Sequence, residues 1–412
     1  MSAGIPHPQI MRGLQLKQLG RYADAAQAFK EALAQEPNDA FALHQLAGCE
    51  WRVPELRKEA LQTIDRAIAI EPNEPEHHVM RAFILCSLDR PKEAMEPIRM
   101  ALAFDPNDSL AHTAEAQAHL QMENWPLAER AARQALALDA DNSGAANQLA
   151  QALRLQNKLD ENAAHLAGML ARDPEDAFTH ANAGWAALQR GQHRDAEVHF
   201  REALRLDPDF EYAREGLLTS FRARSPLYRG YLRYTFAMAR LNRKSRWAVI
   251  IGLYLTVRFA GLLPGGKILA ALYFLFVLWV WVARPVGNAL LLMDRFARYA
   301  LHRAEKIEAG LVASCLFGGI GGIVLSLVFH WDEALLLGVA GIAIAFPLSL
   351  IFTNLSVVGR WIFSGLCLLA AFSTILAFVF DSRISADLFV AACIGCVAST
   401  WLGNIRALYQ RA

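Results

Sequence analysis

A pattern of about 34 residues repeats six times in the first half of this 412-residue sequence. Each copy places small or apolar residues at helical spacing and most copies end at a proline, as in Ala25, Phe29, Ala32 and Pro37. The copies end at residues 37, 72, 106, 140, 174 and 208, so that all spacings are 34 except the first, which is 35. This period is typical of a solenoid of helix pairs, which stack because one pair cannot bury its own apolar face.

The charge distribution divides the chain into two halves. Residues 1–225 contain 24 Lys and Arg against 33 Asp and Glu, whereas residues 226–412 contain 17 against 7. The second half also contains apolar runs of roughly 17–20 residues, which is the length that crosses the hydrocarbon core of a bilayer. We therefore expect an acidic soluble domain followed by a transmembrane bundle over residues 247–405.

Six membrane spans are expected, at residues 247–263, 268–283, 311–329, 334–352, 361–380 and 387–405. The segments on the N-terminal side of the membrane would carry twelve Lys and Arg, whereas the opposite turns carry only Lys267 and Arg383. Because positive charge favours the cytosolic side, we expect both termini and the tail at 406–412 to be cytosolic. The first two spans are also compatible with a re-entrant pair that does not fully cross the membrane, and both versions leave the remaining topology unchanged.

Two basic segments border these spans. Residues 226–246 predict a juxtamembrane linker, which would be attracted by anionic lipid head groups. Residues 285–309 combine leucines with Arg295, Arg298 and Lys306, which is typical of a helix that lies along the membrane surface. The alternative for residues 285–309 is a cytosolic helix packed on the repeats.

Residues 6–208 resemble tandem tetratricopeptide repeats. The resemblance rests on the repeated pattern of small and apolar residues described above. It also rests on a small residue where the two helices of each pair meet, at Gly13, Gly48, Ala82, Ala116, Ala150 and Gly184. The fourth and fifth copies depart from the pattern, with Ala140 in place of proline and with Asn162 and Met169 in place of small residues. The resemblance implies six helix pairs. Residues 209–222 predict a further amphipathic helix that caps them, which gives an all-α domain over residues 1–225.

The resemblance also implies a concave groove that binds a peptide or a partner protein. The residues at groove positions are rich in amides, which can both donate to and accept from a peptide backbone. They are Gln45, Arg52, Phe83, Gln117, Gln121, Asn147, Gln151, Arg154, Asn182, Trp185 and Gln189. Arg154 and Trp185 are the strongest candidates, because arginine and tryptophan dominate binding hot spots. The alternative is that this set is a solvated polar face.

Other candidate sites are weaker. His44, His78, His112 and His180 recur at one position of the repeat, and a packing role is favoured over metal binding or pH sensing. The sequence contains no catalytic constellation and no phosphate loop, so we expect neither an enzyme nor a cofactor or metal, and no nucleic-acid partner. Cys393 and Cys396 lie within a span, where thiols act as small apolar groups.

The expected spans contain signals for helix packing. Gly318 and Gly322 have the spacing that lets two membrane helices meet backbone to backbone, which also allows self-association. Arg258 is the only full charge inside the spans, and the lack of interior carboxylates argues against an ion-coupled carrier.

Together these features predict a multi-pass adaptor that recruits a cytosolic partner to the membrane through its repeats. The competing interpretation is a membrane enzyme or transporter that the repeats regulate, since a single span would suffice for anchoring. Composition and the lack of a targeting sequence at Met1–Gly20 favour a bacterial inner membrane.

Overall fold

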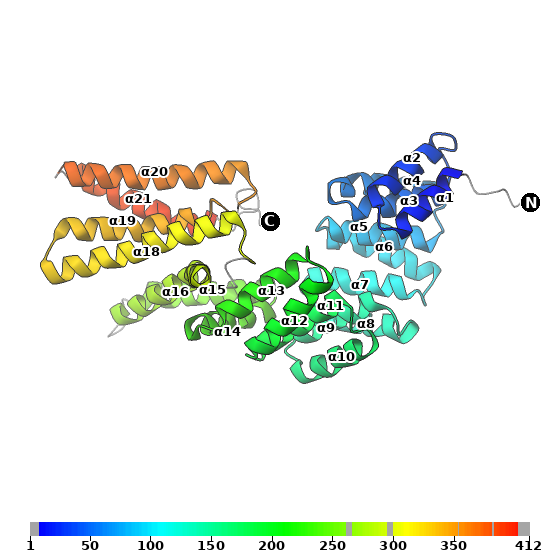
Figure 1. The fold of residues 1–412 in the computed structure, drawn as a ribbon, viewed down its shortest axis with the longest axis horizontal. Helices are drawn as coiled ribbons and strands as arrows, with labels where there is room; N and C mark the ends of the chain where they lie inside the picture. The colour runs from blue at the N-terminus through cyan, green and yellow to red at the C-terminus, as the bar shows by residue number, and fades with distance from the viewer. Residues whose placement is uncertain (1–7, 261–265, 295–299, 353, 381–382, 403–412) are drawn as a thin grey trace, which may run out of the picture. The chain divides into compact units, whose positions relative to one another are not determined.

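The computed structural model describes residues 8–260, 266–294, 300–352, 354–380 and 383–402 (Figure 1). Within these ranges the secondary structure elements are all helices. The chain forms two compact units. The first unit contains the chain up to Ala186 together with Ala239–Arg246, and the second contains Ala187–Met238 and the chain from Trp247 onward.

The predicted repeats fold as antiparallel helix pairs. The first five pairs lie in the first unit, and the sixth pair spans the boundary between the units. The pairs are α1 (Pro8–Gln18) and α2 (Tyr22–Leu33), α3 (Ala40–Arg52) and α4 (Arg57–Ile70), α5 (Pro75–Ser87) and α6 (Pro91–Phe104), α7 (Ser109–Gln121) and α8 (Trp125–Leu138), α9 (Ser143–Leu155) and α10 (Leu159–Arg172), and α11 (Ala177–Gln189) and α12 (His193–Leu206).

The turn inside most pairs contains one residue with a left-handed backbone. Asp89, Glu123, Asn157 and Gly191 have φ angles of 59°, 61°, 63° and 82°, and they are 34 residues apart. Gly20 adopts the same conformation in the first pair, with a φ angle of 71°. Such a residue ends an α-helix by turning the chain away from the helix axis. The second pair lacks this residue and instead turns through the single 3-10 turn η1 (Pro54–Leu56), where the extra residue of the first spacing lies.

The second unit contains α12 and the later helices, except for Ala239–Arg246 at the end of α14 and the start of α15. Besides α12 these are α13 (Glu211–Arg222), α14 (Pro226–Arg240), α15 (Arg243–Ala260), α16 (Gly266–Met293), α18 (Arg303–Phe329), α19 (Asp332–Leu348), α20 (Val357–Val379) and α21 (Arg383–Leu402). The capping helix expected at 209–222 is therefore present as α13. It packs on α12 at Gly216, where a Cβ atom would overlap the fully buried ring of Phe200.

The two basic segments are mainly helical. Residues 226–240 form helix α14, and the juxtamembrane role of residues 226–246 stays a prediction. Residues 285–309 do not form one surface helix, because residues 285–293 continue α16 past Pro285 and residues 303–309 begin α18. Residues 295–299 lie outside the described residues. The extension of α16 is stabilised by packing: Leu291 is buried, and Gly287 lies against Arg222 and Tyr228.

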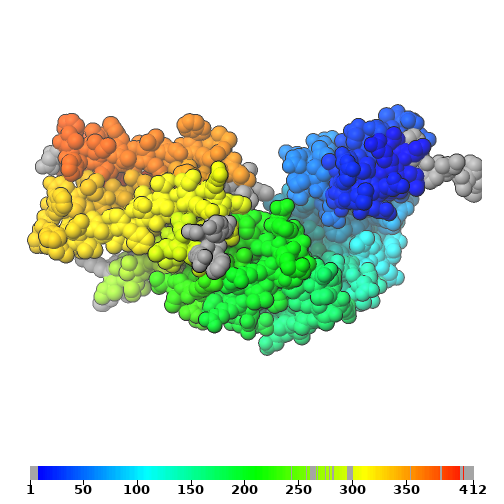
Figure 2. Space-filling view, in the orientation of Figure 1, coloured from blue at the N-terminus to red at the C-terminus, as the bar shows by residue number. Residues whose placement is uncertain are grey.

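In the second unit, α19 packs against both α18 and α20. Figure 2 draws this part of the chain in yellow to orange. Among the described helices, α18 and α20 are long and apolar enough to cross a membrane, whereas α19 has 17 residues. Helices of this kind also occur in the cores of soluble proteins, so the six expected spans stay a prediction at this stage.

Four glycines form the contact between α18 and α19. A Cβ atom on Gly319 would lie 2.8 Å from the carbonyl oxygen of Gly338, and one on Gly322 would lie 2.7 Å from that of Ala334. Gly341 faces α18 in the same way, with Cys315 O at 3.0 Å. A Cβ atom on Gly318 would meet no atom outside its own helix within 4 Å. The expected pair Gly318 and Gly322 is therefore replaced by Gly319 and Gly322, because Gly318 points away from α19.

This contact predicts different effects for the same substitution at two glycines. Gly322→Val introduces a side chain against the backbone of α19, and overpacking of this kind costs about 1–3 kcal/mol. Gly318→Val faces open space and serves as the matched control. Thermal unfolding of the full chain in neutral detergent should show a lower melting temperature for Gly322→Val alone, and equal melting temperatures would contradict the described contact.

Candidate functional site

The eleven predicted groove residues all lie on the first helix of their pair. They occur on α3, α5, α7, α9 and α11, as the resemblance implied. Arg52 and Gln121 are exposed, Asn182 is buried, and the other eight are half-buried. Gln189 belongs to the second unit and the other ten to the first.

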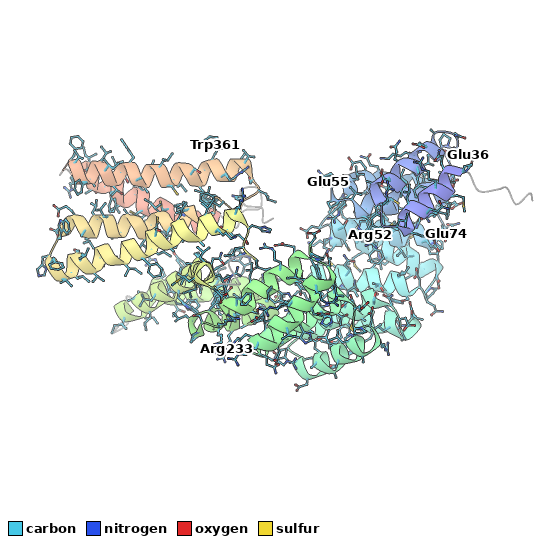
Figure 3. All side chains as sticks on the ribbon, in the orientation of Figure 1. Glu36, Arg52, Glu55, Glu74, Arg233 and Trp361 are labelled. Atoms are coloured by element: carbon cyan, nitrogen blue, oxygen red, sulfur yellow. The ribbon has the colours of Figure 1, made fainter. Side chains whose placement is uncertain are left out.

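An aromatic cluster surrounds Arg52 near the start of this series. The rings of Trp51 and Phe83 stack with centroids 5.8 Å apart, which joins α3 to α5. The Arg52 guanidinium carbon lies 4.8 Å from the centroid of Trp51 and 5.9 Å from that of Tyr22. Arg52 is labelled in Figure 3. An exposed guanidinium on aromatic rings can bind a carboxylate or a peptide carbonyl, while the rings contact apolar side chains.

Several of the predicted amides are already used within the protein. Asn182 Nδ2 donates to Asn147 Oδ1 at 2.9 Å, and Gln121 Nε2 donates to the Cys86 carbonyl at 3.0 Å. Lys17 Nζ donates to Gln45 Oε1 at 2.7 Å. These hydrogen bonds join successive pairs, so part of the set fixes the repeats to each other. The half-buried Arg154 on α9 and Trp185 on α11 continue the series.

The recurring histidines have a structural function that the sequence alone did not specify. The Nε2 atoms of His78, His112 and His180 donate to the carbonyl oxygens of the prolines six residues earlier, at 2.8, 3.1 and 3.0 Å. Each histidine therefore holds the turn between two repeats against the next helix. Among the described residues, no group of three His, Cys, Asp or Glu side chains could hold a metal ion.

His44 differs from the other three histidines. Its Nδ1 atom lies 3.0 Å from Nδ1 of His77, so only one of the two rings can hold a proton there. Burial, followed by the charges of His77 and Lys17, lowers the pKa of His44 to about 4. His77 in turn contacts the Glu71 carboxylate through Nε2 at 3.3 Å.

The lowered pKa of His44 predicts a pH-dependent stability. The unfolded chain takes up a proton on His44 as the pH falls below about 6.5, whereas the folded chain does so only near the folded pKa, which is about 4. Local stability is therefore complete above pH ~6.5 and falls by about 3 kcal/mol on acidification to pH ~4. Hydrogen exchange of the α3 and α5 amides should show this fall, and His44→Gln should reduce it. An equal fall in both proteins would rule out His44 as its source.

Three arginines in and after α13 contact the helices that follow it within the second unit. Arg222 is fully buried, and its Nε donates to Asn288 Oδ1 at 2.8 Å while Nη1 contacts Glu215 Oε1 at 3.1 Å. Arg214 pairs with Glu305 at 3.0 Å, and Arg224 pairs with Asp294 at 2.9 Å. We call this set the α13 junction. It joins the capping helix to α16, to Asp294 just after α16, and to α18.

The charges of the α13 junction reinforce one another. Burial alone would raise the pKa of Glu305, but hydrogen bonds from Arg214 and from the His302 backbone lower it below its usual value. Burial alone would lower the pKa of Arg214, but hydrogen bonds to Glu211 and Glu305 raise it. Both groups therefore stay ionised across the physiological range.

Two arginines of the α13 junction should differ strongly in importance. Arg222→Ala removes a fully buried side chain and leaves the buried Asn288 Oδ1 without its donor, and a buried polar group that loses its partner costs about 1–3 kcal/mol. Arg224→Ala removes a pair whose arginine side chain is 48% exposed, and such pairs contribute at most about 1 kcal/mol. In detergent, the melting temperature of the full chain should fall several times more for Arg222→Ala than for Arg224→Ala. Similar losses in the two variants would contradict this assignment.

A cleft of about 450 Å³ lies in the first unit between α8 and the start of α10. It is lined by Pro126, Glu129, Arg130, Arg133, Gln134, Gln156 and Lys158. The buried Glu129 carboxylate accepts hydrogen bonds from Lys158, Gln156 and Arg133, which lower its pKa against the opposing effect of burial. Lys158 and Arg133, two of the three cations that line the cleft, therefore neutralise the buried carboxylate of Glu129.

Three tetratricopeptide repeat family models match the chain, at residues 6–49, 113–177 and 177–210. The segment from residue 6 to residue 210 thus carries tetratricopeptide repeats. No curated protein matches the chain.

Several solved structures of repeat proteins are similar to this chain. PilW, described as a type IV pilus biogenesis factor, is 20% identical with a TM-score of 0.44, over 51% of this chain and 96% of that one. A tetratricopeptide repeat protein from Parabacteroides merdae is 16% identical with a TM-score of 0.43, over 58% and 95%. YrrB, described as having an unusual peptide-binding site, is 22% identical with a TM-score of 0.33, over 46% and 96%.

Proposed function

We propose that this protein is a multi-pass membrane adaptor whose tetratricopeptide repeats recruit a protein or peptide partner to the membrane. The observation that carries the proposal is an inverted distribution of side-chain size in α18–α21. Small residues are buried between these helices, including Gly319, Ala343, Ala370 and Cys396. Many large apolar residues point outward, although Phe363, Val312 and Leu316 are buried. The outward-facing residues include Phe317, Leu327, Leu337, Leu368, Phe372 and Ile394, which are 56–72% exposed.

Such a surface is stable only in an apolar solvent. Large exposed apolar patches in water favour association, because each such side chain loses about 1.5–3 kcal/mol of burial free energy. Small residues between helices are what membrane bundles use for close packing. Six spans at the expected positions are the simplest arrangement that supplies lipid to this surface.

Tryptophans near the two ends of the bundle support the same arrangement. Trp361 lies in the first turns of α20 and is 76% exposed (Figure 3). Trp331 lies in the turn between α18 and α19 and is 55% exposed. These two positions are at opposite ends of antiparallel helices, and tryptophan favours both membrane–water interfaces. With the basic residues on the Trp361 side, that side would face the cytosol.

The groove on the first helices is the proposed partner site. Arg52 on its aromatic cluster, followed by Arg154 and Trp185, offers charged and aromatic contacts of the kind that dominate binding energy. Confinement at the membrane then raises the local concentration of the bound partner near other membrane components. Recruitment of this kind requires no chemistry from the chain itself.

Two measurements test the proposal. Carbonate extraction of membranes should leave the full chain in the pellet, and release into the supernatant would contradict membrane insertion.

Affinity capture from detergent-solubilised membranes should yield a partner. Arg154→Ala and Trp185→Ala should each reduce the amount of captured partner about tenfold, as expected for hot-spot residues. Arg99→Ala on α6 is the control for an exposed arginine outside the groove. Full capture by both groove variants would disprove the groove assignment.

The competing function, a membrane enzyme or transporter, can be separated by a chimera. Residues 226–412 are replaced by one generic membrane span. Retained recruitment and cellular function would support the adaptor, whereas intact targeting with lost function would show that the bundle itself is active.

A further inference from the structure

Helix α14 has two distinct faces. Tyr228 and Leu232 are buried, whereas Arg229, Arg233 and Ala237 form an exposed stripe at successive spacings of four residues. The helix contains no acidic residue. Arg233 is labelled in Figure 3.

The contacts of α14 show which residues of α16 lie opposite each of its turns. Tyr228 lies against Gly287, Gly230 lies against Trp279, and the ring of Tyr234 meets that of Phe276 with centroids 5.3 Å apart. The two helices therefore run antiparallel in this region. Arg229 lies at the level between residues 279 and 287 of α16, and Arg233 lies about one turn further along.

This level coincides with the edge of the expected span. The span predicted at 268–283 ends where Arg229 lies, so the Arg229 guanidinium would be at the depth of the lipid phosphates. Arg233 lies about one turn further into the expected span, between the levels of Trp279 and Phe276, and its long side chain can extend back toward the phosphates. The rings of Tyr231 and Trp279, whose centroids are 6.4 Å apart, lie between these levels, as expected for residues at the interface.

Arg229 and Arg233 differ from the nearby arginines of the α13 junction. Arg214, Arg222 and Arg224 each pair with a carboxylate. No ion pair involves Arg229 or Arg233 within the part of the chain that the structure describes. Two exposed guanidinium groups on one helical face thus remain available for an external anion.

We propose that Arg229 and Arg233 form a binding site for the phosphate of an anionic phospholipid in the leaflet on the α14 side. A guanidinium binds phosphate oxygens through two parallel hydrogen bonds, and its charge favours an anionic lipid over a zwitterionic one. The site rests on the proposed membrane insertion and adds a lipid class to it. An acidic protein segment could use the same two charges, and the experiment separates these occupants.

The test compares lipid binding by native mass spectrometry of the full chain in neutral detergent. Dioctanoyl-phosphatidylglycerol is titrated into the wild type, into Arg229→Gln/Arg233→Gln, and into Arg190→Gln/Arg194→Gln as a matched control. The control pair is also exposed and four residues apart, but it lies in the sixth repeat. Dioctanoyl-phosphatidylcholine and inorganic phosphate test whether the charge and the lipid are both required.

The wild type and the control should bind phosphatidylglycerol about tenfold more tightly than phosphatidylcholine, and the Arg229/Arg233 variant should lose most of this preference. Equal affinity of wild type and variant for phosphatidylglycerol would overturn the lipid site. Binding of inorganic phosphate as tightly as the lipid would overturn it as well. All variants should remain in the membrane after carbonate extraction, so a failed lipid site is distinguishable from failed membrane insertion.

Discussion

The exposed apolar perimeter of α18–α21 is the constraint from which the rest of the account follows. Burying small residues and exposing large apolar ones reverses the arrangement that water imposes on a soluble core. The glycine contact between α18 and α19 shows how small residues allow close packing, because Gly319 and Gly338 bring the two backbones into direct contact. Lipid would then cover the outward-facing Phe372 and Leu368.

The α13 junction gives the capping helix a second function. In a repeat array the last helix covers an apolar end, and α13 does so where Gly216 meets Phe200. The opposite side of α13 carries Arg214 and Arg222, which pair with residues of α18 and α16. Within the second unit, α13 is thereby joined to α16 and α18 by these hydrogen bonds and ion pairs. Arg229 and Arg233 would add lipid phosphate to the same region.

The sequence predicts the helices well because their period is imposed by local packing, and α13 follows from the same periodicity. Contacts between distant residues are less predictable. The Arg222–Asn288 hydrogen bond joins residues 66 positions apart, and nothing in either segment indicates its partner. The glycine contact is shifted by one residue, since spacing alone does not determine whether Gly318 or Gly319 faces α19. In the groove, Trp51 was not predicted although it adjoins Arg52, and the untested groove positions remain a prediction.

The most direct test of the central claim is to measure whether lipid or water surrounds position 372, near the middle of α20. A nitroxide label at this position, in a chain whose native cysteines are replaced by alanine, is compared in liposomes with a label at Val198 on α12. Both positions carry apolar residues, and they are 62% and 67% exposed. If lipid surrounds α20, the label at residue 372 will collide with oxygen more than with a water-soluble nickel complex, and the label at residue 198 will show the reverse. Equal access of the nickel complex to both labels would contradict the account.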